Sequence, residues 1–145
     1  MKLNVLSLSA LITSLLMSYA HVHAATVLFE IEGIKSDSGK LYVSLFKGQE
    51  NYKAKKPEKS LAIDALAGNK EAIFENITTG EYVIQYFHDE NNNKKLETNL
   101  FGMPTEGFGF SNDAKPNYGP AKYEDMKFVV SGESETVTNN STVIY

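Results

Sequence analysis

Apolar and polar residues alternate along most of the chain after residue 25, and this period of two is the pattern of β-strands with one buried face. In residues 26–34, TVLFEIEGI, the side chains of Val27, Phe29 and Ile31 fall on one face. A short turn containing glycine separates this segment from residues 40–47, KLYVSLFK, which alternates again. The two segments therefore predict a β-hairpin.

Five more segments have the same character and are bounded by turn residues. They are residues 60–66, 71–77, 81–89, 126–131 and 135–145. Seven short strands separated by turn signals predict an all-β fold, a single seven-stranded antiparallel β-sandwich of the immunoglobulin-like kind. No repeat or low-complexity segment divides the chain into further domains.

The first 24 residues predict a secretory signal peptide. One lysine precedes an apolar run from about Leu3 to Met17, which is shorter than the roughly 20 residues that span a bilayer. Small residues place the cleavage after Ala24 or, alternatively, after Ala20. The expected product is one domain, residues 25–145, located in the periplasm or outside the cell with no stable membrane insertion.

The composition excludes several classes of function. The chain has no cysteine, which rules out disulfides, thiol catalysis and cysteine-bound zinc. All 14 basic residues are lysines, and the 18 acidic residues give a net charge of −4. Arginine is the usual residue for bidentate contacts to phosphates and base edges, so its absence argues against nucleic-acid binding.

The longest segment without a strand pattern runs from Asp89 to Tyr118. A loop longer than about 12–15 residues in a compact domain is usually functional or disordered. Disorder fits poorly because the segment is rich in apolar side chains, namely Leu96, Leu100, Phe101, Met103, Phe108, Phe110 and Tyr118. The expectation is one long ordered loop whose aromatic side chains pack over one end of the sandwich.

The start of this loop resembles a calcium-binding sequence. Calcium prefers oxygen ligands, and EF-hand loops supply side chains at positions 1, 3, 5 and 9 and a carbonyl at position 7. Asp89, Asn91, Asn93, Lys95 through its carbonyl, and Glu97 follow this order. These five residues are the candidate ligands of a weak calcium site, the one cofactor that the sequence suggests.

Two positions depart from the calcium pattern. Lys94 stands where such loops need glycine for a positive φ, and Leu100 stands where they need a bidentate glutamate. The alternative is a turn rich in Asp and Asn, in which these side chains bond the loop's own backbone. Both interpretations stay open from the sequence.

The same segment resembles a bacterial family of small exported proteins, domain-of-unknown-function family 2141. The residues that carry the resemblance are His88–Asn91, Asn93, Lys95–Asn99, Phe101, Gly102, Pro104, Glu106–Asn112, Gly119, Pro120 and Asp125–Phe128. The typical pattern has glycine where this chain has Asn92 and Lys94, and aspartate in place of Glu97. The resemblance implies export and a prealbumin-like or carboxypeptidase-regulatory-like sandwich, and it implies no activity.

Enzymatic function has one candidate residue. His88 is the only histidine after the predicted cleavage site and could act as a general base beside Asp89 and Glu90. The alternative is a histidine that orients the loop through hydrogen bonds. No second histidine, cysteine or Gly-x-Ser-x-Gly motif supplies the rest of a nucleophilic triad, so the sequence predicts no enzyme.

The sequence thus predicts a binding or accessory module whose ligand or protein partner is unknown. The candidate binding residues lie in the 88–112 loop and are His88, Asn99, Phe101, Glu106, Phe108, Phe110 and Asn112. One alternative is a purely structural loop that closes the sandwich with weak stabilisation by calcium. A further alternative is a hydrolase that uses His88 and the neighbouring carboxylates.

Overall fold

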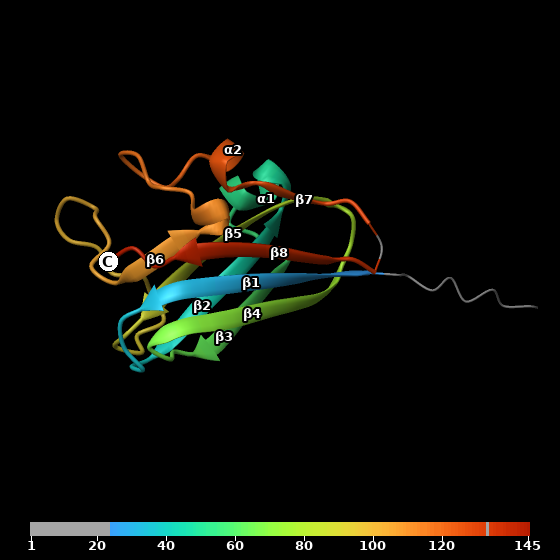
Figure 1. Ribbon diagram of the computed structural model, residues 1–145. Helices are drawn as coiled ribbons and strands as arrows, with labels where there is room; N and C mark the ends of the chain where they lie inside the picture. The colour runs from blue at the N-terminus through green and yellow to red at the C-terminus, as the bar shows by residue number, and fades with distance from the viewer. Residues whose placement is uncertain (1–23, 133) are drawn as a thin grey trace, which may run out of the picture.

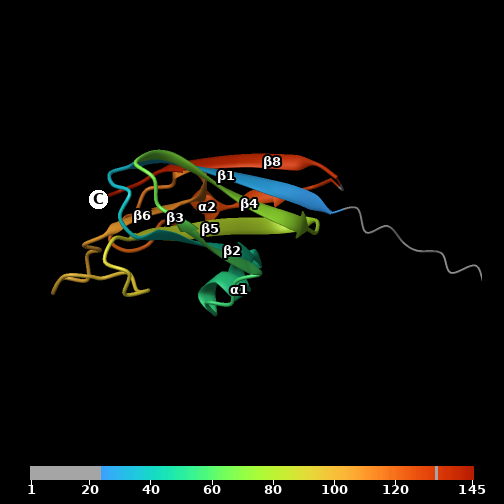
Figure 2. The same cartoon turned by 90° about the horizontal axis from the view of Figure 1, so that it is seen from below.

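The computed structural model describes residues 24–132 and 134–145, so the predicted signal peptide lies outside the described residues except for Ala24. In the described part, eight strands form two sheets that lie face to face (Figures 1 and 2). The strands are β1 (Ala25–Ile34), β2 (Lys40–Lys47), β3 (Lys59–Asp64), β4 (Gly68–Ile77), β5 (Gly80–Asp89), β6 (Gly107–Phe110), β7 (Phe128–Val130) and β8 (Thr136–Thr142).

The small sheet has the strand order β4-β1-β8, and the large sheet has the order β3-β2-β5-β6, with β7 also paired to β5. Every pairing is antiparallel except that of β1 with β8, which is parallel. β5 is therefore the central strand of the large sheet, with β2 on one side and β6 and β7 on the other. It ends at the edge of the molecule where the long loop begins (Figure 1).

The main core lies between the two sheets and is built from the apolar side of each alternating strand. Val27, Phe29 and Ile31 of β1 are fully buried there, as their spacing predicted. From the large sheet, β5 contributes Tyr82 and Tyr86, and the Tyr86 ring meets Phe29 edge to face with centroids 5.6 Å apart. This shared burial of apolar surface is the main force that holds the sheets together.

A second apolar cluster covers the outer face of the large sheet. Two short helices, α1 (Gly48–Lys53) and α2 (Tyr123–Met126), pack against this face, and Figure 2 shows α1 on the outer side of β2. The 3₁₀ turn η1 (Ser111–Asp113) follows β6 and lies beside β8 and α2. The cluster contains Phe46, Val83, Phe108, Phe110, Ala114, Ala121, Tyr123 and Met126. The outer face of β5 is consequently partly covered, with Val83 buried and Gln85 and Phe87 half-buried. No helix in the described part of the chain is long and apolar enough to cross a membrane.

All seven predicted strands are present, and the architecture is a β-rich, sandwich-like pair of sheets. The predicted hairpin of residues 26–34 and 40–47 is wrong, because β1 and β2 lie in different sheets and do not pair with each other. The expected seven-stranded, wholly antiparallel arrangement differs from the structure in two further respects. An eighth strand, β6, lies within the segment expected to be loop, and β8 pairs with β1 in parallel. Local alternation does not reveal which strand pairs with which, because pairing depends on contacts between distant segments.

The short strand β6 has the sequence GFGF because its two faces meet very different surroundings. Phe108 and Phe110 point into the outer cluster. On the other face, a Cβ atom at Gly109 would lie 2.4 Å from the Tyr86 hydroxyl oxygen, and one at Gly107 would lie 2.6 Å from the Tyr145 ring. Only glycine leaves room for these two tyrosines.

One cross-strand pair on the exposed face of the small sheet is unfavourable. Glu30 of β1 lies directly opposite Glu71 of β4, and like charges in register destabilise a sheet. We expect Glu71→Lys to raise the free energy of unfolding by about 0.5 kcal/mol by making an opposite-charge pair. Urea denaturation measures this change.

A matched control for this substitution is Glu75→Lys. Glu75 lies on the same exposed side of β4, but the strand register shifts there, and Glu75 faces no acidic partner in the described part of β1. Glu75→Lys changes the net charge by the same amount as Glu71→Lys. An equal gain in the free energy of unfolding in both variants would therefore attribute the effect to net charge and contradict the pairwise explanation.

Candidate functional site

The loop between β5 and β6, residues 90–106, leaves the large sheet at two buried polar residues, His88 and Asp89. One carboxylate oxygen of Asp89 accepts the N–H of Asn93 at 3.0 Å, and the other accepts the N–H of Lys94 at 2.9 Å. A buried carboxylate needs such donors because its desolvation is otherwise costly. Asp89 therefore folds the start of the loop into a tight turn.

The next polar side chains continue this turn by bonding the loop itself. The side-chain oxygens of Asn91 and Asn93 each accept a backbone N–H two residues ahead, at 3.0 and 2.8 Å, which are Asx turns. Their amide groups donate to the two oxygens of Glu97 at 3.0 and 2.9 Å. Asn92 and Lys94 have φ angles of 60° and 64°, so two non-glycine residues take the left-handed conformation.

These contacts bear on the five predicted calcium ligands, Asp89, Asn91, Asn93, Lys95 and Glu97. All belong to this one turn, and the oxygens of four of them accept hydrogen bonds from loop N–H groups. Within the described residues, no group of three or more histidine, cysteine or acidic side chains is placed to hold a metal ion. The geometry corresponds to the Asx-rich turn that the sequence offered as the alternative to calcium.

Glu106 closes the base of the loop. Its side chain is buried, and its two carboxylate oxygens accept the N–H groups of Glu90 and Glu97, each at 3.2 Å. One carboxylate thus ties the outgoing and returning halves of the loop together. Glu106, predicted as a binding residue, is occupied by these backbone contacts.

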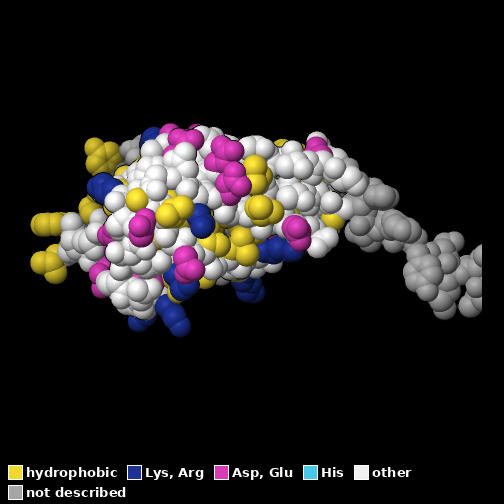
Figure 3. Space-filling model, turned by 60° about the horizontal axis from the view of Figure 1, so that its bottom comes forward, with side chains coloured by type: hydrophobic (Ala, Val, Ile, Leu, Met, Phe, Trp, Pro, Cys, Tyr) yellow, Lys and Arg dark blue, Asp and Glu magenta, His cyan; other side chains and the backbone are white. Residues whose placement is uncertain are grey.

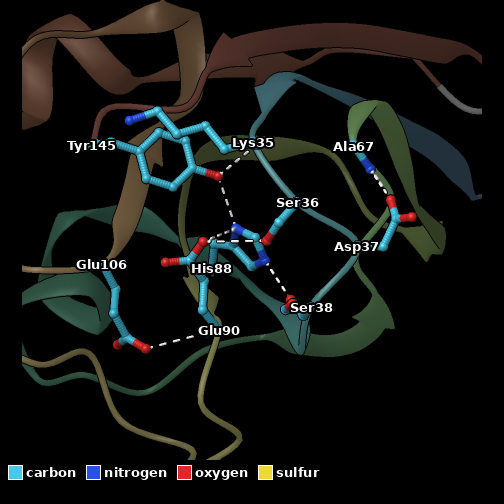
Figure 4. Close-up of polar contacts among 9 residues, drawn as sticks. All are labelled: Lys35, Ser36, Asp37, Ser38, Ala67, His88, Glu90, Glu106 and Tyr145. Atoms are coloured by element: carbon cyan, nitrogen blue, oxygen red, sulfur yellow. Dashed lines mark hydrogen bonds and ion pairs between the residues drawn. The ribbon is translucent and has the colours of Figure 1, made fainter.

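His88 joins three separate segments at this end of the sandwich (Figure 4). Its Nε2 lies 2.7 Å from the carbonyl oxygen of Ser38, which can only accept, so Nε2 carries the proton. In the neutral ring, Nδ1 then accepts a hydrogen bond from the Tyr145 hydroxyl at 2.8 Å. His88 is fully buried and both ring nitrogens are engaged, so it connects the β1–β2 turn to the end of the chain.

Tyr145 completes this arrangement by bridging to the opposite sheet. Its hydroxyl oxygen accepts the backbone N–H of Lys35, which follows β1, at 3.0 Å. The Lys35 ammonium lies 4.0 Å from the centre of the Tyr145 ring, a cation–π contact. Partial burial raises the pKa of Tyr145 above its ordinary value. Nearby, Asp37 accepts the N–H of Ala67 at 2.6 Å, which joins the β1–β2 and β3–β4 turns (Figure 4).

The outer part of the loop forms a narrow turn that we call the tip, residues 98–104. Thr98 and Pro104 form an isolated antiparallel bridge, and the Asn99 N–H donates to the Met103 carbonyl at 2.8 Å. The Asn99 side-chain oxygen accepts the N–H groups of Phe101 and Met103 at 2.9 and 3.1 Å. Hydrogen bonds within the backbone of the tip and from the Asn99 side chain therefore determine its conformation.

The apolar side chains of the tip point into solvent. Relative exposure is 101% for Leu100, 91% for Phe101 and 60% for Met103, and Tyr118 in the following loop is also fully exposed. The sequence predicted that the aromatic side chains of the loop would pack over the end of the sandwich. Phe101 and Tyr118 do not pack there, whereas Phe108 and Phe110 are buried. Among the predicted binding residues, Asn99 and Phe101 belong to the tip.

Of the remaining predicted binding residues, two are buried and the third, Asn112, is exposed but hydrogen-bonded to the fold. Phe108 and Phe110 are buried in the outer cluster. The Asn112 side chain donates to the Lys127 carbonyl at 2.8 Å and accepts from the Asn139 amide at 2.6 Å. These contacts join η1 to the segment after α2 and to β8, so all three residues have structural roles.

Two open pockets of about 350 and 400 Å³ lie elsewhere, along the β4 edge of the small sheet. Ile73, which is half exposed, lines both of them, and Lys59 of β3 lines the first. The Lys59 ammonium donates to the Glu75 carbonyl at 2.5 Å and so covers part of this edge. No residue of the 90–106 loop contributes to either pocket, so these cavities are separate from the tip.

The Asp89 contacts predict a measurable loss of stability in an alanine variant. We expect Asp89→Ala to lower the free energy of unfolding by about 2 kcal/mol, because two backbone N–H groups lose a charged acceptor. Asn91→Ala, which removes an exposed acceptor from the same turn, is the control and should cost under about 1 kcal/mol. Urea denaturation of the three proteins provides the comparison.

The same proteins distinguish a hydrogen-bonded turn from a cation site. If the turn is held by hydrogen bonds alone, melting temperatures in EDTA and in millimolar calcium should agree. A rise with calcium that disappears in Asp89→Ala would contradict this expectation and establish the calcium site.

Comparison with known proteins adds one relationship. Residues 29–138, from the middle of β1 into β8, match the family described as an uncharacterized protein conserved in bacteria, DUF2141. No significant match was found among curated proteins or among solved structures. The match spans both sheets and the whole 90–106 loop, in agreement with the resemblance carried by the loop residues. The chain therefore belongs to the DUF2141 family of uncharacterized bacterial proteins.

Proposed function

We propose that this protein is a non-catalytic binding or accessory module that contacts its partner through the tip. The observation that carries the proposal is the near-complete exposure of Leu100 and Phe101 on a turn shaped by its own hydrogen bonds. Neighbouring apolar side chains left in water are a common mark of interaction sites. Loops at the end of a rigid sandwich are a frequent place for binding residues.

We also propose that the module is exported and acts in the periplasm or outside the cell. The lysine-led apolar run and the small residues before Ala24 support this location. Family membership supports a finer assignment of the sandwich to the prealbumin-like or carboxypeptidase-regulatory-like kind. In this setting the tip would be the part of the domain that recognises a ligand or protein.

A second candidate is a purely structural loop that closes the end of the sandwich. The observation in its favour is that Asp89, Asn91, Asn93, Glu97 and Glu106 all bond the loop itself. These contacts concern the base of the loop and leave the tip without a packing role. The binding proposal is preferred because it accounts for both parts.

The hydrolase alternative is less favoured. A general base needs a free nitrogen within reach of its substrate. His88 has no exposed surface, and its ring nitrogens are bonded to Ser38 and Tyr145. A hydrolytic role for His88 would require the Tyr145 contact to open.

The two candidate functions predict different consequences of changing the tip. If the tip serves binding, Leu100→Ser combined with Phe101→Ser should change the free energy of unfolding by less than about 0.5 kcal/mol, because both side chains are already in water. Urea denaturation against the unmodified protein provides the measurement. A loss above about 2 kcal/mol would instead favour the structural plug.

Site-specific photo-crosslinking in the producing bacterium tests the binding proposal directly. A photoreactive residue is placed at Leu100 and, as matched controls, at the exposed apolar positions Leu66 and Val129. We expect a discrete adduct, either protein or lipid, at position 100 and not at the controls. Excess unmodified protein should compete for this adduct, and the Leu100→Ser, Phe101→Ser variant should not.

Equal labelling at all three positions, or no adduct at position 100, would contradict a binding role for the tip. The crosslink captures the partner whatever its chemical identity. It also separates a partner bound at the tip from one bound along β4, because a residue placed at Ile73 would report on that edge.

A further inference from the structure

We propose that the partner of the tip is an anionic lipid bilayer surface, into whose interface Leu100, Phe101 and Met103 insert. This inference rests on the proposed binding function and names its partner. Residues 98–105, TNLFGMPT, contain no charged side chain, so nothing in the outermost part of the loop opposes entry into the interface. Apolar and aromatic side chains are the groups that anchor proteins at the boundary between headgroups and acyl chains.

The shape of the tip favours a deformable partner. The tip is a projection rather than a groove, and Figure 3 shows apolar side chains standing out from the end of the molecule that carries the loops. A stable protein interface needs roughly 800 Å² from each partner. Three side chains on one narrow turn fall short of that area, whereas a bilayer accepts projecting side chains without a matching pocket.

The backbone groups of the tip already form hydrogen bonds within the loop in the absence of a partner, which favours insertion. The Asn99 side-chain oxygen accepts the N–H groups of Phe101 and Met103, and the Gly102 N–H donates to the Asn99 carbonyl at 2.9 Å. Glu97 accepts the Thr105 N–H through its carbonyl at 2.9 Å. These bonds satisfy backbone groups that would otherwise be costly to remove from water.

The charge distribution fits an anionic surface. Residues 94–122 carry four lysines and three acidic residues, although the whole chain has 18 acidic residues against 14 lysines. Of the three, Glu106 is buried, Asp113 forms an ion pair with Lys115, and the exposed Glu97 bonds the amide groups of Asn91 and Asn93. Lys94 and Lys95, four and three residues before the tip, are exposed and available to lipid headgroups.

Four acidic residues lie together on a different surface. Glu30 and Glu32 of β1 and Glu71 and Glu75 of β4 lie on the outward side of the small sheet, since the alternate residues of both strands are in the core. A bilayer with negative headgroups would repel this sheet and attract the lysines at the loop end. The domain would therefore meet the surface with its loop end first.

Fluorescence offers a direct test because the chain has no tryptophan. Phe101→Trp places a single reporter at the tip, and Val129→Trp places one at an apolar position that is 59% exposed in β7, beside the start of β5 and away from the loop end. Both proteins are purified in the form that cells accumulate and are titrated with vesicles of phosphatidylethanolamine and phosphatidylglycerol. The segment before β1 is identical in both proteins, so any contribution from it is shared.

We expect a blue shift of the tip reporter on addition of the anionic vesicles and none of the Val129→Trp reporter. Adding Leu100→Ser and Met103→Ser to the Phe101→Trp protein should weaken vesicle binding at least about tenfold, because each apolar side chain contributes transfer energy. Lys94→Gln with Lys95→Gln should weaken binding to these vesicles and leave the weaker binding to phosphatidylcholine vesicles unchanged.

Several results would overturn the lipid assignment. They are an unshifted Phe101→Trp spectrum, equal vesicle binding by the Leu100→Ser, Met103→Ser protein, and a concentration-dependent blue shift without vesicles, which would mean that the tip binds a second copy of the chain. If the protein does not bind vesicles but the photoreactive residue at position 100 crosslinks to a protein in cells, the lipid inference is wrong and the binding function is supported. If position 100 also gives no adduct, both fall.

Discussion

The end of β5 is the constraint on which the rest of the molecule depends. β5 is the central strand of the large sheet, with one face in the main core and the other partly covered by the outer cluster, yet it ends in the buried polar pair His88 and Asp89. Two ionisable side chains without exposure are tolerated only when their polar atoms have partners. Asp89 finds them in the loop, and His88 finds them in Ser38 and Tyr145. The packing is tight here, since a Cβ at Gly39 would lie 1.8 Å from the Asp89 carbonyl oxygen. This close approach is possible only for glycine, whose φ of 74° is also the left-handed conformation that it adopts readily.

This constraint divides the loop into two parts with different physical roles. The base is held by buried carboxylates, so its conformation is set by charge-assisted hydrogen bonds. The tip buries almost nothing and is shaped by bonds that Asn99 makes. A rigid base that presents an exposed apolar turn is the arrangement expected of a surface whose contacts lie outside the molecule, because folding alone gains nothing from exposing Leu100 and Phe101.

Much of the fold could be predicted from the sequence, because the alternation of apolar and polar residues in β1, β2 and β5 indicates directly which positions are buried. β6 was missed because four residues with two glycines give too short a signal, and its glycines are explained only by Tyr86 and Tyr145, which are distant in sequence. The exposure of the tip was missed for a related reason. Composition indicates how much apolar surface a segment has, but not whether any other segment lies close enough to cover it. The loop pattern called for a positive φ at position 94, and Lys94 adopts it although it is not glycine, with its N–H donated to Asp89.

The loop pattern that identifies the family can now be divided by physical role. His88, Asp89, Glu106, Gly107, Gly109 and Asn112 are accounted for by burial, close packing or hydrogen bonds. Asn99 and Gly102 shape the tip, the latter with a φ of 76°. Phe101 belongs to the same pattern, yet its ring is 91% exposed and nothing in the described part of the fold requires an aromatic residue there. An apolar side chain that is exposed to water at a cost in free energy, and that has no structural role, is the strongest indication of function in the loop. For that reason the search for a partner should begin at Phe101 rather than at His88 or the Asp and Asn side chains.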